Sequence, residues 1–263
     1  MEFYSFNSRI PRVLFALSLI GFSIQHFLFG EFITGRAPAY PTNFAGQSFF
    51  SFATGGLFFL CAIALVLEKN AWRLLAVCGV VILFWAAGRN ILVLVANPEY
   101  GGLLTNTFKG LTLGFGAFII AASFREKGTS SFSNKLVGFM STSGNYIVGL
   151  FLLVAGVQHF IFVDFVNFLV PAWLPFIPFW TYFSGVALIA AGLGLITGIK
   201  RQLAALLAGY MVLGWVLLLH LPRVVEYQNQ NEWTSVLEAL AVGSILLIIS
   251  DQHSHITDKL PQT

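Results

Sequence analysis

The sequence carries little charge. Charged residues make up only 10% of its 263 residues, against about 25% in a typical soluble domain. The 14 Lys and Arg residues outnumber the 11 Asp and Glu residues, which gives a net charge of +3. These positive residues lie between apolar runs and form no basic stripe, so the composition argues against a soluble enzyme and against a nucleic-acid partner.

Cysteine is also scarce. Cys61 and Cys78 are the two cysteines, both lie inside apolar runs, and they form no C-x-x-C motif. Two such residues exclude a disulfide scaffold, and cysteines in apolar surroundings are usually inert. We therefore expect packing roles for both and no dithiol chemistry within this chain.

Several motifs of soluble catalysis are missing. The sequence contains no G-x-x-x-x-G-K-[ST], G-x-G-x-x-G, G-x-S-x-G or H-E-x-x-H pattern. These motifs belong to nucleotide, dinucleotide, serine-hydrolase and zinc-protease sites. Nor is any stretch between the apolar runs long enough to form a nucleotide-binding domain. Whether the chain is an enzyme is left open by the sequence, and no metal ligand set is identified.

Long apolar runs are what the sequence has in abundance. Apolar residues make up 57% of the chain, and about twenty apolar residues in helical form cross the hydrocarbon core of a bilayer. The runs are continuous rather than alternating, which favours helices over a barrel. The prediction is an all-α membrane protein whose first partner is the lipid bilayer. Its eight transmembrane helices are expected at 13–30, 49–67, 72–94, 103–124, 146–168, 174–198, 203–222 and 233–250.

Positive charges predict the orientation of these spans. The N-terminal segment, every second loop and the C-terminal tail together hold 10 of the 14 Lys and Arg residues, and the alternate loops hold 4. Because positive loops stay in the cytoplasm, we expect an inner-membrane protein with both termini cytoplasmic. The Ala37-Pro-Ala39 stretch resembles a signal-peptidase site weakly, and we expect the first span to be retained.

The two halves of the chain repeat. Residues 25–32 read QHFLFGEF and residues 158–165 read QHFIFVDF, with five of eight positions identical at an offset of 133. Offsets of 130 and 129 align further residues, such as Trp85 with Trp215 and Gly114 with Gly243. The near-constant offset indicates duplication of one four-helix unit.

The duplication predicts the domain organisation. We expect a first four-helix unit over 1–124, a cytoplasmic linker over 125–145, and a second unit with a short tail over 146–263. An even number of spans gives both units the same orientation. Two tandem four-helix bundles would then be related by a pseudo-twofold axis along the membrane normal.

Polar residues gather in the outer halves of the predicted spans. Inside hydrocarbon such groups are costly unless satisfied, so they are candidates for function. We therefore predict a polar pocket in each unit, open to the extracytoplasmic side. The predicted ligand-binding residues are Gln25, His26, Arg89, Asn90, Gln158, His159, His220 and Arg223.

The histidines have three open interpretations. Hydrogen bonding to a substrate or between helices is favoured over a quinone or proton-relay role, and both are favoured over haem or metal ligation. A haem would need two facing histidines, such as His26 with His159 or His159 with His220. Arg89 and Arg223 would either reach the membrane surface, pair with an acid, or hold an oxyanion in the guanidinium fork.

One polar pair is predicted to be structural. Lys109 and Glu238 occupy equivalent positions with opposite charge, 129 residues apart. If the fourth and eighth spans meet at the pseudo-axis, the two side chains can pair across it. Pairing is favoured, with ligand or proton chemistry and snorkelling to the interface as the alternatives.

The stretches GVQHF (156–160) and VPAWLPFIPFWTYFSGVALIAAGLGLI (170–196) resemble the DoxX-like membrane proteins. The resemblance is clearest over 146–222 and weaker over 13–67. It implies a four-helix bundle, here present twice, in the cytoplasmic membrane. It also implies links to thiosulfate:quinone oxidoreductase subunits or to thiol and oxidative-stress complexes. It carries no agreed catalytic residue over to this chain.

These observations lead to one favoured function and two alternatives. The favoured hypothesis is a membrane component of a quinone-linked redox system, with a soluble or membrane redox partner. A quinone is then the expected cofactor and haem is disfavoured. The alternatives are a small-molecule transporter and a non-catalytic membrane scaffold, and the substrate stays unidentified.

Overall fold

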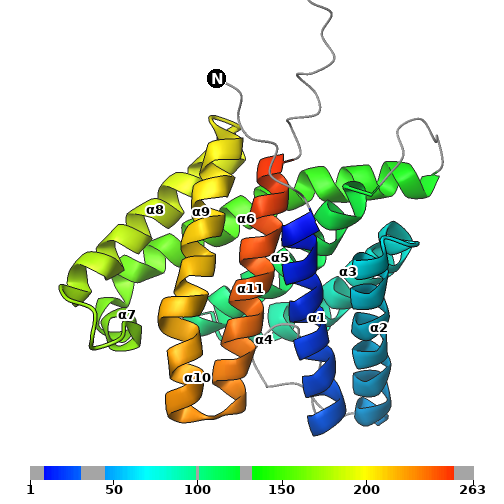
Figure 1. The fold of residues 1–263 in the computed structure, drawn as a ribbon, viewed down its shortest axis with the longest axis horizontal. Helices are drawn as coiled ribbons and strands as arrows, with labels where there is room; N and C mark the ends of the chain where they lie inside the picture. The colour runs from blue at the N-terminus through cyan, green and yellow to red at the C-terminus, as the bar shows by residue number, and fades with distance from the viewer. Residues whose placement is uncertain (1–8, 31–44, 99–100, 125–131, 252–263) are drawn as a thin grey trace, which may run out of the picture.

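The computed structural model describes residues 9–30, 45–98, 101–124 and 132–251, and these are helical apart from short connections. Figure 1 shows the arrangement of the elements. The helices are α1 (Arg9–Phe29), α2 (Gln47–Leu67), α3 (Ala71–Trp85), η1 (Ala86–Ile91), α4 (Leu92–Ala96), α5 (Gly101–Ala122), α6 (Phe132–Ile161), α7 (Val163–Leu169), α8 (Ile177–Thr197), α9 (Arg201–Trp215), η2 (Val216–His220), α10 (Leu221–Tyr227) and α11 (Gln230–Asp251).

The predicted number of spans is confirmed. Within the described residues, eight helical segments are long and apolar enough to cross a membrane. Two of them are compound, because η1 joins α3 to α4 and η2 joins α9 to α10 without a break. The chain is therefore a multi-pass, all-helical protein of membrane type.

The boundaries differ from the prediction most at the middle of the chain. Helix α6 begins at Phe132, so the residues from there to 145 are helical rather than a linker. Their polar character misled the prediction, since they read KLVGFMSTSGN (135–145). The far end of this span also breaks early, because α6 stops at Ile161 and the separate short helix α7 follows. Residues 125–131 and the Ala37-Pro-Ala39 stretch lie outside the described residues.

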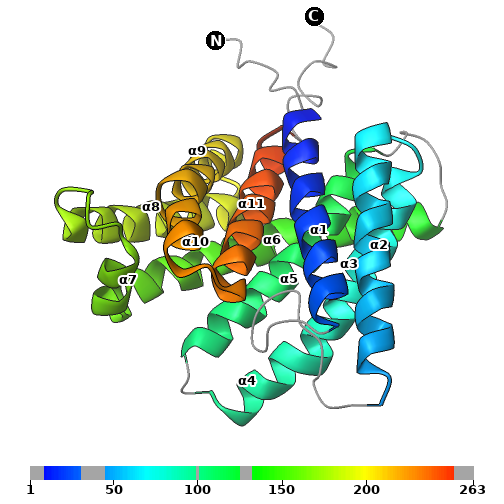
Figure 2. The ribbon, with the colours of Figure 1, turned by 60° about the horizontal axis from the view of Figure 1, so that its bottom comes forward.

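Neighbouring helices in the chain pack side by side and close into a ring. In order, α1 packs on α2, α2 on α3, α3 on α5, α5 on α6, α6 on α8, α8 on α9, and α9 on α11. The ring closes because α11 packs on α1, and α5 also contacts α11 across its middle. We call α5 and α11 the central pair. Figures 1 and 2 show α11 beside α1, although these helices are far apart in sequence.

This arrangement differs from two separate tandem bundles. Each half leaves its first helix against the last helix of the other half: α1 packs on α11, and α6 packs on α5. The central pair is accordingly the most enclosed part of the fold. Of the most apolar window of each span, 72% is buried in α11 and only 22% in the segment Arg201–Tyr227.

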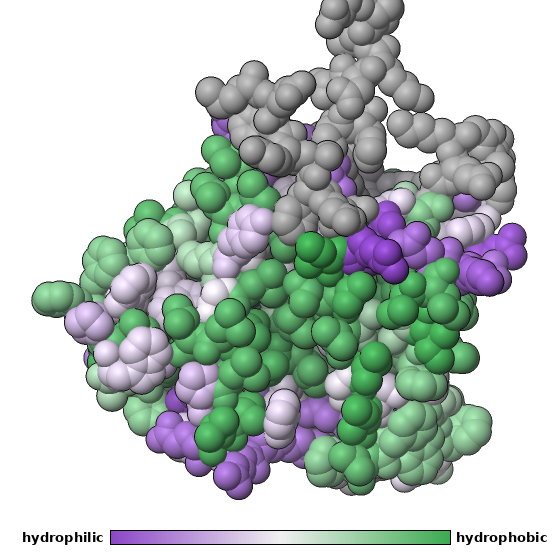
Figure 3. Space-filling model, in the orientation of Figure 1, coloured by the Kyte–Doolittle hydropathy of each residue, from purple (hydrophilic) through white to green (hydrophobic). Residues whose placement is uncertain are grey.

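The surface has the distribution expected for a bilayer. Figure 3 shows a broad apolar zone with hydrophilic residues above and below it. Large apolar side chains are exposed along the outer helices, for example Leu92 and Val95 on α4 and Leu217 on η2. A soluble monomer rarely exposes such continuous apolar surface. Helix α1 begins and α11 ends at the same end of the molecule (Figure 1), which an even number of crossings requires.

Glycine allows the tight helix crossings. A Cβ atom added to Gly55 on α2 would lie 2.9 Å from the Cβ of His26, and one added to Gly185 on α8 would lie 2.9 Å from the Cβ of His159. Distances this short do not occur between real carbon atoms without displacement. The two equivalent glycines therefore let α1 approach α2, and α6 approach α8, along the faces that carry the histidines.

Candidate functional site

Two π-helical segments occupy equivalent positions in the two halves. Segment η1 begins at Ala86 and η2 at Val216, an offset of 130 residues. Each follows a tryptophan, Trp85 or Trp215, that is equivalent at the same offset. A π-helical turn inserts one extra residue, shifts the helix register and is frequent at functional sites. Each segment also packs on the central pair, η1 on α5 and η2 on α11.

The first π-helical segment lines a small recess with polar atoms that lack partners. The recess lies between η1 with α4 and the start of α5, and its volume is about 190 Å³. Arg89 Nε and Asn90 Oδ1 are buried and make no hydrogen bond. The amide of Asn90 is nevertheless fixed, because its Nδ2 donates to Asn106 O at 2.9 Å. The lining is completed by Asn106 and two apolar residues, Val93 and Leu103. We call it the Arg89 recess.

The two predicted glutamines tie the halves together rather than facing a cavity. Gln25 on α1 donates from Nε2 to Thr234 Oγ1 on α11 at 3.1 Å. Equivalently, Thr105 on α5 donates to Gln158 Oε1 on α6, and Gln158 Nε2 donates to Gly101 O at 2.9 Å. Gln25 and Thr234 are almost fully buried. Their polar groups are thus largely used by helix–helix contacts.

The first two histidines are held by their own helices. His26 Nδ1 lies 2.7 Å from Phe22 O, and His159 Nδ1 lies 2.8 Å from Ala155 O. A carbonyl oxygen only accepts hydrogen bonds, so in each contact Nδ1 is the donor. The ring of His26 also packs edge-on against Phe58 of α2, with centroids 5.4 Å apart.

These contacts place the two histidines in different hairpins. His26 lies in the α1–α2 contact, and His159 lies in the α6–α8 contact. The facing geometry that a haem would need from His26 and His159 is therefore not what this packing provides. His220 closes η2, where it takes the position equivalent to Asn90. Among the described residues, no group of three or more His, Cys, Asp or Glu side chains is placed to hold a metal ion.

Lys109 and Glu238 are brought together in the central pair. Lys109 Nζ on α5 lies 2.6 Å from Glu238 Oε2 on α11. The Glu238 side chain is 3% exposed and the Lys109 side chain is 20% exposed. In a medium that solvates ions poorly, each charge needs the other. The pair lies one helical turn from Thr105 and Thr234, so it continues the row of contacts that joins the halves.

Arg223 is occupied by a partner that the sequence analysis did not identify. Its Nε and Nη2 donate to the two carboxylate oxygens of Glu232 at 3.1 and 2.8 Å. The guanidinium also lies over the ring of Tyr227, 4.7 Å from its centroid. This two-point contact joins α10 to the start of α11. Arg223 is therefore a structural residue of this end and is not aimed at a ligand.

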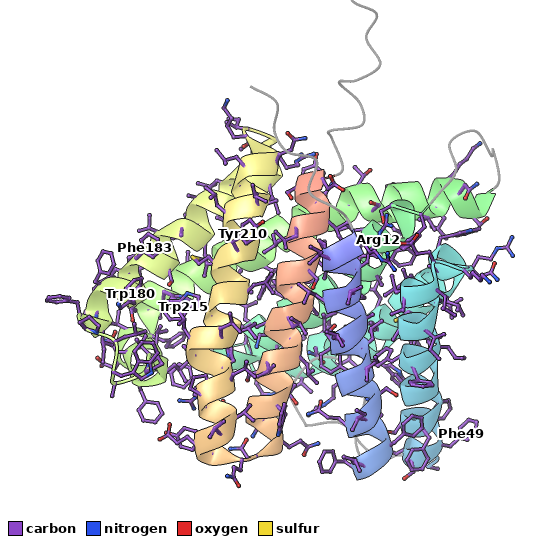
Figure 4. All side chains as sticks on the ribbon, viewed as in Figure 1. Arg12, Phe49, Trp180, Phe183, Tyr210 and Trp215 are labelled. Carbon is purple, nitrogen blue, oxygen red and sulfur yellow. The ribbon has the colours of Figure 1, made fainter. Side chains whose placement is uncertain are left out.

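Aromatic contacts repeat around both π-helical segments. Phe50 of α2 meets the ring of Trp85 edge-on at 5.9 Å, and Trp180 of α8 meets the ring of Trp215 in the same way at 6.1 Å. Figure 4 shows Trp180 and Trp215 close together between α8 and α9. Trp85 Nε1 also donates to Thr54 Oγ1 at 3.3 Å. These rings support the helix immediately before it widens into the π-helical turn.

Sequence analysis missed some residues and misjudged others. Asn106 forms part of the recess, but its signal was only its position next to Thr105. Cys61 and Cys78, considered separately in the sequence, hydrogen-bond to each other through their thiols across α2 and α3. No sequence motif predicts a contact between residues on two helices whose rotation about their axes is unknown.

Taken together, the polar residues divide by what they contact. Gln25, Gln158, the Lys109–Glu238 pair and Arg223 have their principal contacts within the protein. Arg89 and Asn90 keep buried atoms for a further group, a hydrogen-bond donor and an acceptor side by side. Such a pair suits a small group with a carbonyl or oxyanion oxygen beside a hydroxyl.

Comparisons with known proteins add one similarity. A family model described as a domain of unknown function (DUF8561) matches residues 148–247, which lie in the second half and cover less than half of the chain. No curated protein and no solved structure matches the chain.

Proposed function

We propose that this protein binds the polar head group of a small ligand, a membrane quinone or an oxyanion, in the Arg89 recess. In this proposal it acts as the membrane component of a quinone-linked redox system, as the DoxX-like resemblance implies. The observation that carries the proposal is the pair of buried, unpartnered atoms, Arg89 Nε and Asn90 Oδ1, beside one recess. A buried polar atom without a partner costs about 1–3 kcal/mol, which a ligand would recover.

The size of the recess favours a head group over a whole ligand. At about 190 Å³ it is smaller than the roughly 300–1,000 Å³ pockets that enclose a drug-sized molecule. A quinone presents a carbonyl oxygen to Arg89, and its reduced form presents a hydroxyl to Asn90 Oδ1. Its apolar tail would then lie along the exposed side chains of α4, which continue from the recess.

The proposal includes an orientation and a symmetry. We place the protein in the inner membrane with both termini in the cytoplasm, on the strength of the 10 to 4 distribution of positive residues. The Arg89 recess then opens toward the extracytoplasmic side. The matching Gln–Thr contacts support a pseudo-twofold axis along the membrane normal that passes between α5 and α11. Reporter fusions after spans of each parity would test the orientation.

The test of the proposed function begins with what co-purifies. The protein is isolated in mild detergent, its absorption spectrum is recorded, and its bound lipids are extracted and identified by mass spectrometry. The expected result is a quinone at a stoichiometric ratio and no Soret band. Arg89→Gln and Asn90→Leu should each reduce the bound quinone about tenfold, the effect of losing roughly one hydrogen bond to a charged or buried group.

The matched control removes an arginine elsewhere at the same end. Arg223→Gln combined with Glu232→Gln deletes a charge pair without touching the recess, so its quinone content should equal that of the wild type. Equal quinone content in all variants would contradict the proposal. Absence of quinone, together with failure of added quinone and of sulfite or thiosulfate to bind, would contradict it as well.

A second candidate function is proton-coupled transport of a small molecule. The observation that favours it is the Lys109–Glu238 pair inside a membrane-spanning region, because paired intramembrane charges often mark proton or substrate pathways. Proteoliposomes with a pH-sensitive dye inside would test it. Proton flux that depends on an added solute and disappears in Glu238→Gln would favour transport over the redox proposal.

A further inference from the structure

The two cysteines of the chain meet within the first half. Cys61 lies on α2 and Cys78 on α3, and both are fully buried. The thiol of Cys61 donates to Leu74 O at 3.4 Å. This leaves the lone pairs of its sulfur available, and the two thiols are hydrogen-bonded to each other. The two sulfur atoms are therefore in contact, with no side chain between them.

The second half shows that packing does not require sulfur at these positions. At an offset of 130, Cys61 corresponds to Ala191 and Cys78 to Ala208, and both alanines are buried. The equivalent hairpin thus forms with methyl groups where the first half has thiols. Because a small side chain is sufficient for the contact, packing alone does not account for two thiols at one contact.

The location of the thiols favours a lipid-dissolved reactant. Cys61 is about 9 Å from the end of α2 and Cys78 about 10 Å from the start of α3, at a rise of 1.5 Å per residue. Their neighbours in sequence, Leu60 and Val77, are each about half exposed on the apolar surface. One layer of side chains therefore separates the sulfurs from lipid at the end of the molecule where α1 begins.

We infer that Cys61 and Cys78 form a redox-active dithiol that a membrane quinone oxidises to a disulfide. One S–S bond forms and two S–H bonds break. The two electrons and two protons pass to the quinone, which becomes the hydroquinone, so atoms and charges balance. The reaction needs a transient opening of the α2–α3 contact, because both sulfurs are closed to solvent in the resting fold.

This inference rests on the quinone-linked function proposed above but uses a different place. Arg89 lies eleven residues beyond Cys78 on the same span, which is about 16 Å along a helix. A quinone seated in the Arg89 recess is thus too far away for thiol attack. The oxidising quinone must approach the α2–α3 contact from the lipid.

The experiment counts thiols. The protein is purified reduced, freed of reductant under argon, and mixed in detergent with a decyl benzoquinone whose ring positions are all substituted, so that thiol addition is blocked. After acid quenching, the unfolded chain is alkylated with N-ethylmaleimide and its intact mass is measured. The expected change is from two alkylated thiols per chain to none, with one hydroquinone formed for each disulfide and no covalent dimer.

Three controls make the result decisive. Cys61→Ala and Cys78→Ala should each keep one alkylatable thiol after quinone treatment. The double variant, which copies Ala191 and Ala208, should fold as well as the wild type. Arg89→Gln should oxidise as the wild type does, which separates this inference from the proposed function.

Two results would overturn the inference. One is that both thiols remain alkylatable in wild-type protein that stays folded throughout the quinone treatment. The other is that the thiols disappear only through disulfides between chains. Loss of quinone from the recess in Arg89→Gln, with either result, would leave the proposed function standing and remove the dithiol.

Discussion

At the scale of single residues, the polar side chains divide into those with partners in the protein and those that keep a free atom. Lys109 and Glu238 neutralise each other between the central helices, and Arg223 is held by Glu232. Arg89 and Asn90 instead place an unpartnered nitrogen and oxygen beside a recess. This division, and not polarity alone, singles out the Arg89 recess.

The Lys109–Glu238 pair predicts asymmetric costs of substitution. Lys109→Met leaves a buried carboxylate without its cation, and Glu238→Gln leaves a cation without its carboxylate. Removing one member of a buried pair typically costs about 3–5 kcal/mol. Each single variant should therefore unfold at a clearly lower temperature in detergent, as followed by size-exclusion chromatography after heating.

Exchange of the two charges is the corresponding test of pairing. Lys109→Glu with Glu238→Lys should recover most of the stability lost in either single substitution, because the attraction across α5 and α11 is restored. A double variant no more stable than the singles would show that the two charges act independently.

The glutamine contacts predict equal effects in the two halves. Gln25→Leu and Gln158→Leu each remove a side-chain contact to a threonine on the central pair. Such interhelical hydrogen bonds are worth about 0.6 kcal/mol on average and up to about 1.7 kcal/mol. Both variants should lower the unfolding temperature by similar small amounts, and a large difference between them would contradict their equivalence.

At the scale of elements, the helices are fixed by close crossings and by the π-helical turns. The α3–α5 crossing brings Gly79 against Gly114, and the α9–α11 crossing brings Gly209 against Gly243. Beyond each crossing, the span widens at η1 or η2 and turns its polar residue toward the central pair. The crossing and the π-helical turn together determine where Asn90 and His220 lie.

The crossings differ in tightness, which gives an ordered prediction. An added Cβ at Gly79 would lie 2.8 Å from Gly114 O, whereas one at Gly209 would lie 3.3 Å from Gly243 O. Gly79→Ala should therefore destabilise more than Gly209→Ala, within the roughly 1–3 kcal/mol typical of overpacking. Gly56→Ala, which meets nothing within 4 Å, is the control and should be neutral. Thermal unfolding curves of the three variants would establish the order.

The elements also show what sequence could and could not predict. Apolar runs identify the eight spans because the cost of burying charge in lipid acts on every residue of a run. The same rule failed at 132–145, where polar residues continue α6 beyond the apolar run. The π-helical turns and the contact of Cys61 with Cys78 were not predictable, because each depends on the rotation of one helix against another. Polarity identified Arg89 and Asn90 as candidates, but it could not separate them from Gln25 or Arg223.

At the scale of the whole molecule, the ring of helices makes each half depend on the other. Helix α1 needs α11, α6 needs α5, and α5 contacts α11 directly. Cutting the chain between the halves would expose Gln25, Thr234 and Glu238 to lipid in the separated parts. Unpaired polar groups in hydrocarbon are costly, so the halves gain stability from association.

A split chain tests this dependence. Residues 1–124 and 132–263, expressed separately, should aggregate or be degraded, because neither half buries its polar face. When both are expressed together with a tag on one, the untagged half should co-purify in a one-to-one complex. Two separately stable, monodisperse halves would instead support independent tandem bundles. The measurement is size-exclusion chromatography of each preparation in the same detergent.

The position of Lys109 and Glu238 has a consequence for how such a chain can arise. The two residues are equivalent in the repeat and face each other between α5 and α11. A homodimer built from either half alone would put the same side chain on both sides of that contact, two ammonium groups or two carboxylates. Like charges repel there, and a symmetric ancestor would have needed an uncharged residue. Only after gene fusion, when the copies diverged independently, does a complementary pair become available, and that pair then disfavours a return to identical subunits.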